Sequence, residues 1–135
     1  MLFATEEWFA AWVDAANADD RFRAAGVGWK GSVGLVVLGR VDTFARLDGA
    51  EGRWTTLAVG TAPVLVEGTT FTISADAATW RELVEQRLDP LRALIVGRAR
   101  IRGQLSAILA RTTALRVMTA IAGGLDTTFV ESAGP

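Results

Sequence analysis

The amino-acid sequence predicts an α+β domain with a sheet of about five strands and helices on either side of it in the chain. Three observations lead to this prediction. The chain has 135 residues, enough for one hydrophobic core but hardly two, so we expect a single domain over residues 1–135. Apolar residues recur at helical spacing near both ends of the chain, whereas the middle alternates as strands do. Strands bracketed by helices are typical of α+β folds.

The first helix is predicted to begin after Thr5, whose hydroxyl can cap it, with Glu6 and Glu7 favourably placed in the first turn. Its apolar positions recur at helical spacing and comprise Trp8, Phe9, Trp12, Val13 and Ala16. Asn17 and Asp19 are candidate caps for a continuation that carries Phe22, and Gly26 and Gly28 allow the chain to turn.

An antiparallel meander is predicted to follow. Trp29–Leu38 and Arg40–Leu47 are typical of strands, and residues 48–52 form a turn before Arg53–Val59. Residues 60–63 interrupt the meander, after which we expect Val64–Val66 and then Phe71–Ser74 as further strands.

Helical spacing returns after this meander. Asp76 can cap a helix through Trp80 and Val84, and Asp89 with Pro90 opens another helix that Gly97 ends. Arg98–Arg102 alternates as a short half-buried strand does. A final helix is expected over residues 105–122, and residues 127–135 are expected to be loosely structured.

The final helix has two apolar stripes on nearly opposite sides, which one straight surface helix cannot both bury. One stripe is Leu105, Ile108, Leu109, Thr112 and Leu115, and the other is Ala114, Val117, Met118, Ile121 and Leu125. Either the helix bends near Thr112 and Thr113, or its far end presents an apolar face to something else. That partner is a ligand entrance or a second copy of the chain, as in a homodimer.

Composition argues against several classes of function. Half of the residues are hydrophobic, which excludes a disordered chain, and the longest uncharged run, Trp54–Val66, is too short to span a membrane. No secretory signal is recognisable at the N-terminus, so cytoplasm is the expected location. A net charge of −1 gives no general attraction to nucleic acid. The pattern Gly26-Val27-Gly28-Trp29-Lys30-Gly31 lacks the strand before it and the helix after it that dinucleotide binding requires.

Catalysis is not expected. The chain has no His, Cys or Tyr, which removes the usual triads, the common zinc sites and the commonest acid–base residue. Glu82 and Glu85 are conceivable as paired carboxylates, but their spacing beside Arg81 is typical of an exposed helix face. We therefore expect no enzyme, no metal site and no cofactor.

The stretch from Phe71 to Leu109 resembles the sterol carrier protein 2 (SCP2) family. The resemblance is carried by Phe71-Thr-Ile-Ser-Ala-Asp76-Ala-Ala-Thr-Trp80-Arg-Glu-Leu83 and by the run Leu88-Asp89-Pro90, apolar helix, Gly97, alternating Arg98 to Arg102, Gly103. Gln86, Leu94, Ile95 and Gln104 depart from the family pattern. The resemblance implies an α+β fold whose curved antiparallel sheet of about five strands is covered by helices and encloses an apolar tunnel.

The resemblance also implies an apolar ligand: a fatty acid, an acyl-CoA or a sterol-like molecule. The expected tunnel wall comprises Phe9, Trp12, Phe44, Trp80, Leu91, Leu94, Ile95, Ile108, Leu115 and Met118, although large aromatic residues on helices usually fill core. Arg98, Arg100 and Arg102 share one strand face, which either is solvated or contacts lipid headgroups during transient membrane contact. The expected function is non-catalytic lipid binding or transport, and the alternative is an accessory or oligomerising module that presents substrate to a separate enzyme.

Overall fold

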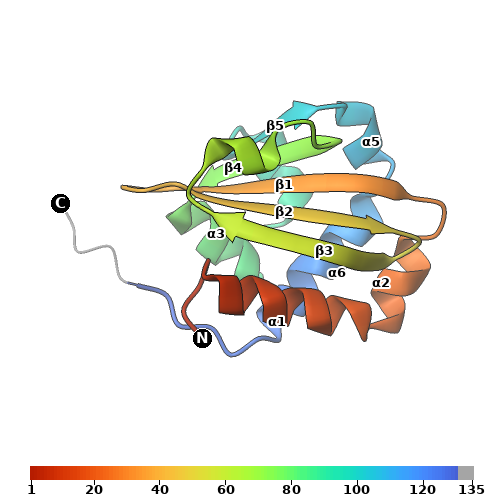
Figure 1. Cartoon of the computed structure of the whole chain (residues 1–135), viewed down its shortest axis with the longest axis horizontal. Helices are drawn as coiled ribbons and strands as arrows, with labels where there is room; N and C mark the ends of the chain where they lie inside the picture. Colours follow the sequence, from red (N-terminus) through yellow and green to blue (C-terminus); the bar gives the residue numbers. More distant parts are fainter. Residues whose placement is uncertain (131–135) are drawn as a thin grey trace.

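The computed structural model describes residues 1–130, in which one five-stranded sheet is covered on one face by helices (Figure 1). The α+β class predicted from the sequence is confirmed. The strands are β1 (Lys30–Leu38), β2 (Thr43–Ala50), β3 (Arg53–Gly60), β4 (Phe71–Asp76) and β5 (Ala99–Gly103), in the order β3-β2-β1-β4-β5. The helices are α1 (Glu6–Asn17), α2 (Asp20–Ala25), the 3-10 turn η1 (Pro63–Val66), α3 (Ala77–Val84), α4 (Pro90–Ile95), α5 (Leu105–Leu109) and α6 (Thr112–Gly123).

The sheet is mixed, which differs from the antiparallel sheet expected. β1 pairs in parallel with β4, and the other three pairings are antiparallel. The expected strand over Val64–Val66 is wrong, because this segment forms η1. Pro63 fixes its own φ at a helical value and occupies the favoured first position of a helical turn. The turn lets the chain return beside β1 in the same direction as β1.

Most of the predicted helix caps are confirmed. The Thr5 hydroxyl accepts from Trp8 N at 3.2 Å, and a carboxyl oxygen of Asp76 accepts from Thr79 N at 2.7 Å. Asp19 and Asp89 cap α2 and α4 in the same way. Asn17 does not cap a helix. Its amide instead binds the backbone N and O of Trp54, both at 2.8 Å, and so fastens the end of α1 to β3.

Of the two alternatives for the last helix, the structure shows the bend, about two residues earlier than expected. The chain breaks at Ala110 and Arg111 into α5 and α6, so the two segments run in different directions. Leu105 and Leu109 of the first stripe nevertheless stay half exposed. Ile108 on α5 and Met118 on α6 are both buried.

The chain after α6 is more ordered than predicted. Thr128 N donates to Met1 O at 2.7 Å, and Phe3 N donates to Thr128 O at 2.9 Å. These bonds hold residues 127–130 against the N-terminus. The rest of the predicted loose segment, residues 131–135, lies outside the described residues.

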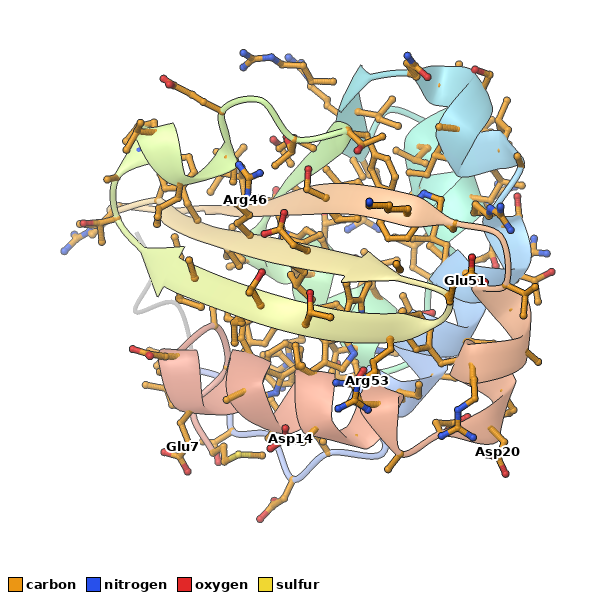
Figure 2. All side chains as sticks on the ribbon, turned by 45° about the vertical axis from the view of Figure 1, so that its right-hand side comes forward. Glu7, Asp14, Asp20, Arg46, Glu51 and Arg53 are labelled. Atoms are coloured by element: carbon orange, nitrogen blue, oxygen red, sulfur yellow. The ribbon has the colours of Figure 1, made fainter. Side chains whose placement is uncertain are left out.

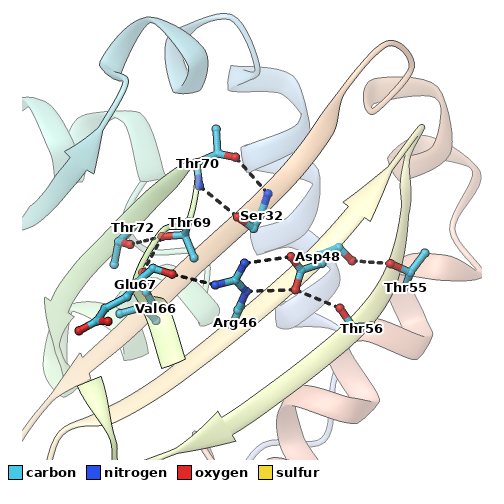
Figure 3. A network of polar contacts seen from close by, with 10 residues as sticks. All are labelled: Ser32, Arg46, Asp48, Thr55, Thr56, Val66, Glu67, Thr69, Thr70 and Thr72. Atoms are coloured by element: carbon cyan, nitrogen blue, oxygen red, sulfur yellow. Dashed lines mark hydrogen bonds and ion pairs between the residues drawn. The ribbon is translucent and has the colours of Figure 1, made fainter. Parts of the chain in front are cut away.

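The two faces of the sheet differ in chemistry. The inner face packs against α1 and α3, which α6 contacts in turn, and carries most of the hydrophobic core. The outer face carries η1 and a polar network, in which Arg46 donates to Asp48 and to Glu67 O, and Asp48 accepts from Thr56 (Figure 3). Within residues 1–130 no helix has the length and apolar character needed to cross a bilayer. The apolar interior therefore lies between the inner face and the helices.

Candidate apolar binding site

Two apolar cavities lie between the inner face of the sheet and the helices. Cavity 1 offers about 90 Å³ to the centres of water-sized molecules and lies beside α2 and the start of α6, with Phe22, Trp29 and Trp54 in its wall. Cavity 2 offers about 50 Å³ and lies beside α3 and α4, with Phe9, Trp80 and Leu94 in its wall. Both walls are almost wholly apolar.

The cavities adjoin each other. Five residues line both, and they come from α1, from the two central parallel strands and from α6: Trp12, Leu35, Ile73, Leu115 and Met118. These side chains form a partition, which we call the shared wall.

Hydrogen bonds hold the large aromatic side chains in place. Trp12 Nε1 donates to Met118 O and Trp80 Nε1 donates to Val36 O, each at 2.9 Å, so both indoles satisfy their polar atom and turn apolar rings toward the cavities. The rings of Trp8, Phe9 and Trp12 pack on one another, with Trp8 and Trp12 centroids 5.3 Å apart. This packing fixes the position of the α1 side of the wall.

Trp54 differs from these residues. It is 8% exposed and lines cavity 1, yet its Nε1 is a buried donor without an acceptor within residues 1–130, where no other buried side-chain polar atom lacks a partner. An unsatisfied buried donor costs about 1–3 kcal/mol. The wall of cavity 1 therefore includes a tryptophan whose buried donor is unsatisfied, beside two basic residues, Arg53 and Arg111.

Seven of the ten residues predicted for the tunnel wall lie at the cavities. Phe9, Trp80 and Leu94 line cavity 2, Ile108 lines cavity 1, and three line both: Trp12, Leu115 and Met118. All but Leu94 and Leu115 are buried. The structure thus brings together residues from α1, α3, α4, α5 and α6 that are far apart in the sequence.

The other three predicted residues lie elsewhere. Phe44 is buried on the outer face, opposite Val36, because strand alternation turns its neighbours Ala45 and Leu47 inward. Leu91 is half-buried and lines neither cavity. Ile95 is 75% exposed, since the short helix α4 buries Pro90 and Ala93 instead.

The predicted arginine stripe is divided in the structure. Arg98 donates to Thr79 and forms an ion pair with Glu82 on α3, and this hydrogen bond lowers the pKa of Glu82 below its usual value. Arg100 and Arg102 are exposed on the edge strand β5, opposite Ser74 and Thr72 of β4. Neither lines a cavity.

The carboxylates considered as an acid–base pair are engaged with arginines. Glu82 binds Arg98, and Glu85 binds Arg87 and Arg81. The hydrogen bond from Arg87 lowers the pKa of Glu85. A general acid needs the opposite shift, so this pair is suited to ionised surface contacts.

Sequence reasoning missed the strand residues of the wall. These are Val33, Leu35, Val37, Leu47, Phe71 and Ile73, together with Phe22, Trp29 and Trp54 at the end of cavity 1. The signal was present, because residues 33, 35 and 37 and residues 71, 73 and 75 follow the two-residue period of one strand face. Which face carries the helices could not be read from that period.

These features define a class of protein: an α+β domain whose helices leave an apolar space over one face of a mixed sheet. No protein-family model matches the chain, and no curated protein matches it. Among solved structures, the crystal structure of sterol carrier protein 2 has a TM-score of 0.84 and 27% identity, over 91% of this chain and 98% of that one. A conserved hypothetical protein from Thermus thermophilus has a TM-score of 0.80 and 28% identity, over 89% of this chain and 87% of that one.

The chain is therefore an SCP2-like domain, and the resemblance drawn from the sequence is confirmed. Palmitated SCP2L2 from Aedes aegypti shares the fold at a TM-score of 0.59 and 15% identity, over 82% of this chain and 95% of that one.

Proposed function

We propose that this domain binds one lipid-like molecule in cavities 1 and 2 and transfers it within the cytoplasm without covalent chemistry. The observation that carries the proposal is the pair of adjoining apolar cavities that only the shared wall separates. The neighbours support it, because the Aedes aegypti protein of the same fold carries palmitate.

The size of the cavities bounds the ligand. A water molecule needs about 10–15 Å³ of such volume, so 90 Å³ and 50 Å³ together hold roughly nine to fourteen groups of that size. An acyl chain of about ten carbons would fit once the shared wall opens, and each buried methylene stabilises binding by about 0.8 kcal/mol. Longer chains and sterol rings require further movement of the helices.

Native mass spectrometry of the purified protein, followed by titration with fatty acids and sterols, tests this proposal. We expect a co-purified lipid, or saturable binding of an added one. A protein that purifies without lipid and binds neither fatty acids nor sterols would contradict the proposal. That result would favour the alternative, an accessory module that presents substrate to a separate enzyme. The ubiquinone synthesis protein UbiJ-SCP2, which shares the fold at 13% identity and a TM-score of 0.52, fits this alternative.

Leu94 and Ile95 provide a matched test of cavity 2. Leu94→Asp places a carboxylate in the apolar wall, where it cannot be desolvated without a partner, and we expect affinity for a fluorescent fatty acid to fall by about tenfold or more. Ile95→Asp makes the same change at a side chain that is 75% exposed, and we expect unchanged affinity. Equal affinities for both folded variants in a fluorescence titration would remove cavity 2 from the site.

The free donor of Trp54 predicts where the polar end of the ligand lies. A ligand oxygen that packs against Trp54 in cavity 1 and reaches Nε1 would accept from it, which would remove the cost of leaving that donor unpaired. We expect the Trp54 indole proton to move downfield in an ¹⁵N-correlated NMR spectrum when a fatty acid binds, with the peak assigned through Trp54→Phe. If this peak does not move at saturating ligand, the polar end of the ligand does not lie at Trp54.

A further inference from the structure

Strand β5 forms one edge of the sheet. It comes last in the strand order, and Figure 1 shows it as the outermost strand, beyond β4. Alternate residues of an edge strand direct their backbone N–H and C=O groups away from the sheet. Within residues 1–130, the backbone of Ala99–Gly103 has no hydrogen-bond partner other than β4. The free side of β5 is therefore a row of unpaired backbone donors and acceptors.

The opposite edge of the sheet is covered. α1 runs alongside β3 (Figure 2). The side-chain amide of Asn17 also binds the backbone N and O of Trp54, both at 2.8 Å. Because an open edge can pair with another chain, such cover prevents strand addition at β3. β5 is the edge of this sheet that another strand can extend.

Two arginines of β5 have no counter-charge. Arg100 and Arg102 are exposed on the outer face, opposite Ser74 and Thr72 of β4. Within residues 1–130, neither arginine forms an ion pair. The one acidic residue of β4, Asp76, lies at the end of that strand and caps α3. The outer side of β5 thus carries two positive charges that only solvent balances within the described chain.

The inward side chains of β5 are apolar. Ala99 is buried and Ile101 is half-buried, opposite Ala75 and Ile73 of β4. Strand alternation therefore gives β5 a basic outer row and an apolar inner row. A strand added along β5 would place its own alternate side chains beside these two rows. The matching sequence has acidic residues at every second position and apolar residues between them.

A second copy of the chain does not match this edge. Two β5 strands paired antiparallel about Ile101 would place Arg100 of one copy opposite Arg102 of the other. Like charges directly opposite each other on one sheet face destabilise strand pairing. The charge of β5 therefore favours a partner strand of opposite charge.

We propose that β5 binds an extended segment of a partner protein in which acidic and apolar residues alternate. Hydrogen bonds between the two backbones hold the segment, and its carboxylates accept from Arg100 and Arg102. Its apolar side chains lie beside Ile101. The inference goes beyond lipid binding and does not depend on it, because neither arginine lines a cavity.

Fluorescence polarisation with the full chain tests the partner chemistry. The probe is a labelled six-residue peptide that alternates valine with glutamate. One control peptide alternates valine with lysine, and another has the composition of the probe with its glutamates adjacent. The wild-type protein should bind the probe about tenfold or more tightly than either control, since opposite charges must meet in register. Absence of probe binding, or equal binding of all three peptides, overturns the proposal.

Backbone methylation separates strand addition from charge attraction alone. Amides of successive residues in a strand point to opposite sides, so either the valine amides or the glutamate amides of the probe face β5. We therefore compare two probes, one N-methylated at its valines and the other at its glutamates. One of them should lose binding and the other should keep it. Equal effects of the two methylations would show that no strand is added.

Reversal of the charge locates the contact. Arg100→Glu with Arg102→Glu should bind the valine–lysine peptide in preference to the probe. Lys30→Glu with Arg40→Glu makes the same change of net charge at exposed positions outside β5, and it should bind the probe as the wild type does. An unchanged preference in the first variant would remove β5 from the contact. Both variants should keep wild-type affinity for a fluorescent fatty acid, which reports on the proposed function separately.

The oligomeric state tests the choice of partner. Analytical ultracentrifugation of the wild-type protein should show a monomer, because the arginines of two β5 strands repel each other. A dimer that the valine–glutamate probe dissociates would assign the edge to a second copy and overturn the acidic partner.

Discussion

Replacement of Leu115 by Trp is expected to lower the affinity for an apolar probe by about tenfold or more while the protein stays folded. Leu115 is half-buried in the shared wall, so a larger side chain there extends into space that the ligand would occupy. A ligand that has lost room for even a few methylenes loses about 0.8 kcal/mol for each. Titration of a fluorescent fatty acid measures the affinity, and circular dichroism on the same sample shows whether the protein is folded.

The control for this variant lies on the same helix. Thr113→Trp adds the same ring at an exposed position of α6 that lines neither cavity, and we expect its affinity to equal that of the wild type. If a folded Leu115→Trp protein binds the probe normally, the cavities are not the binding site. Overpacking alone costs typically about 1–3 kcal/mol of stability, which the melting curve would show separately.

The largest loss of stability is expected from Gly52→Ala. Gly52 lies in the β2–β3 turn with a φ of 72°, and a Cβ atom there would lie 2.5 Å from Arg23 O, a backbone atom of α2. The left-handed backbone alone costs a non-glycine residue about 1–2 kcal/mol. Because the clash involves two backbone segments, relief requires α2 to move, and we expect a total loss of about 3 kcal/mol or more.

Gly68 supplies the comparison. It has the same φ of 72°, but nothing lies within 4 Å of a Cβ atom built on it. Gly68→Ala should therefore show only the backbone cost of about 1–2 kcal/mol. Denaturant unfolding of the two variants gives the difference. Equal losses would mean that α2 does not pack against the hairpin as tightly as the structure indicates.

Local features of the fold were predictable from the sequence. Thr5, Asp76 and Asp89 were recognised as caps because a cap acts on backbone groups only two or three residues away. The parallel pairing of β1 with β4 was not predictable, since it depends on the path that η1 takes over the outer face. Three apolar residues after Pro63 have no period that distinguishes a strand from a helical turn.

The candidate site was predictable on the longer helices α1, α3 and α6, but not on the six-residue helices α2 and α4, where Phe22 was missed and Leu91 and Ile95 were misplaced. Trp12 and Met118 lie on strongly periodic helices, and their apolar faces could only turn toward the sheet. Phe44 was misplaced because the sequence does not show which of two alternating strand faces is covered. The SCP2 resemblance indicated an apolar interior but not its division by the shared wall.

All five tryptophans of the chain line a cavity: Trp29 and Trp54 line cavity 1, Trp8 and Trp80 line cavity 2, and Trp12 lines both. Intrinsic tryptophan fluorescence can therefore report when a ligand enters the cavities. A polyene fatty acid that enters the interior becomes an energy-transfer acceptor for nearby indoles, and the order in which single-tryptophan variants are quenched records the ligand's route. Stopped-flow emission from Trp29 and Trp80 would show at which end of the interior it first arrives.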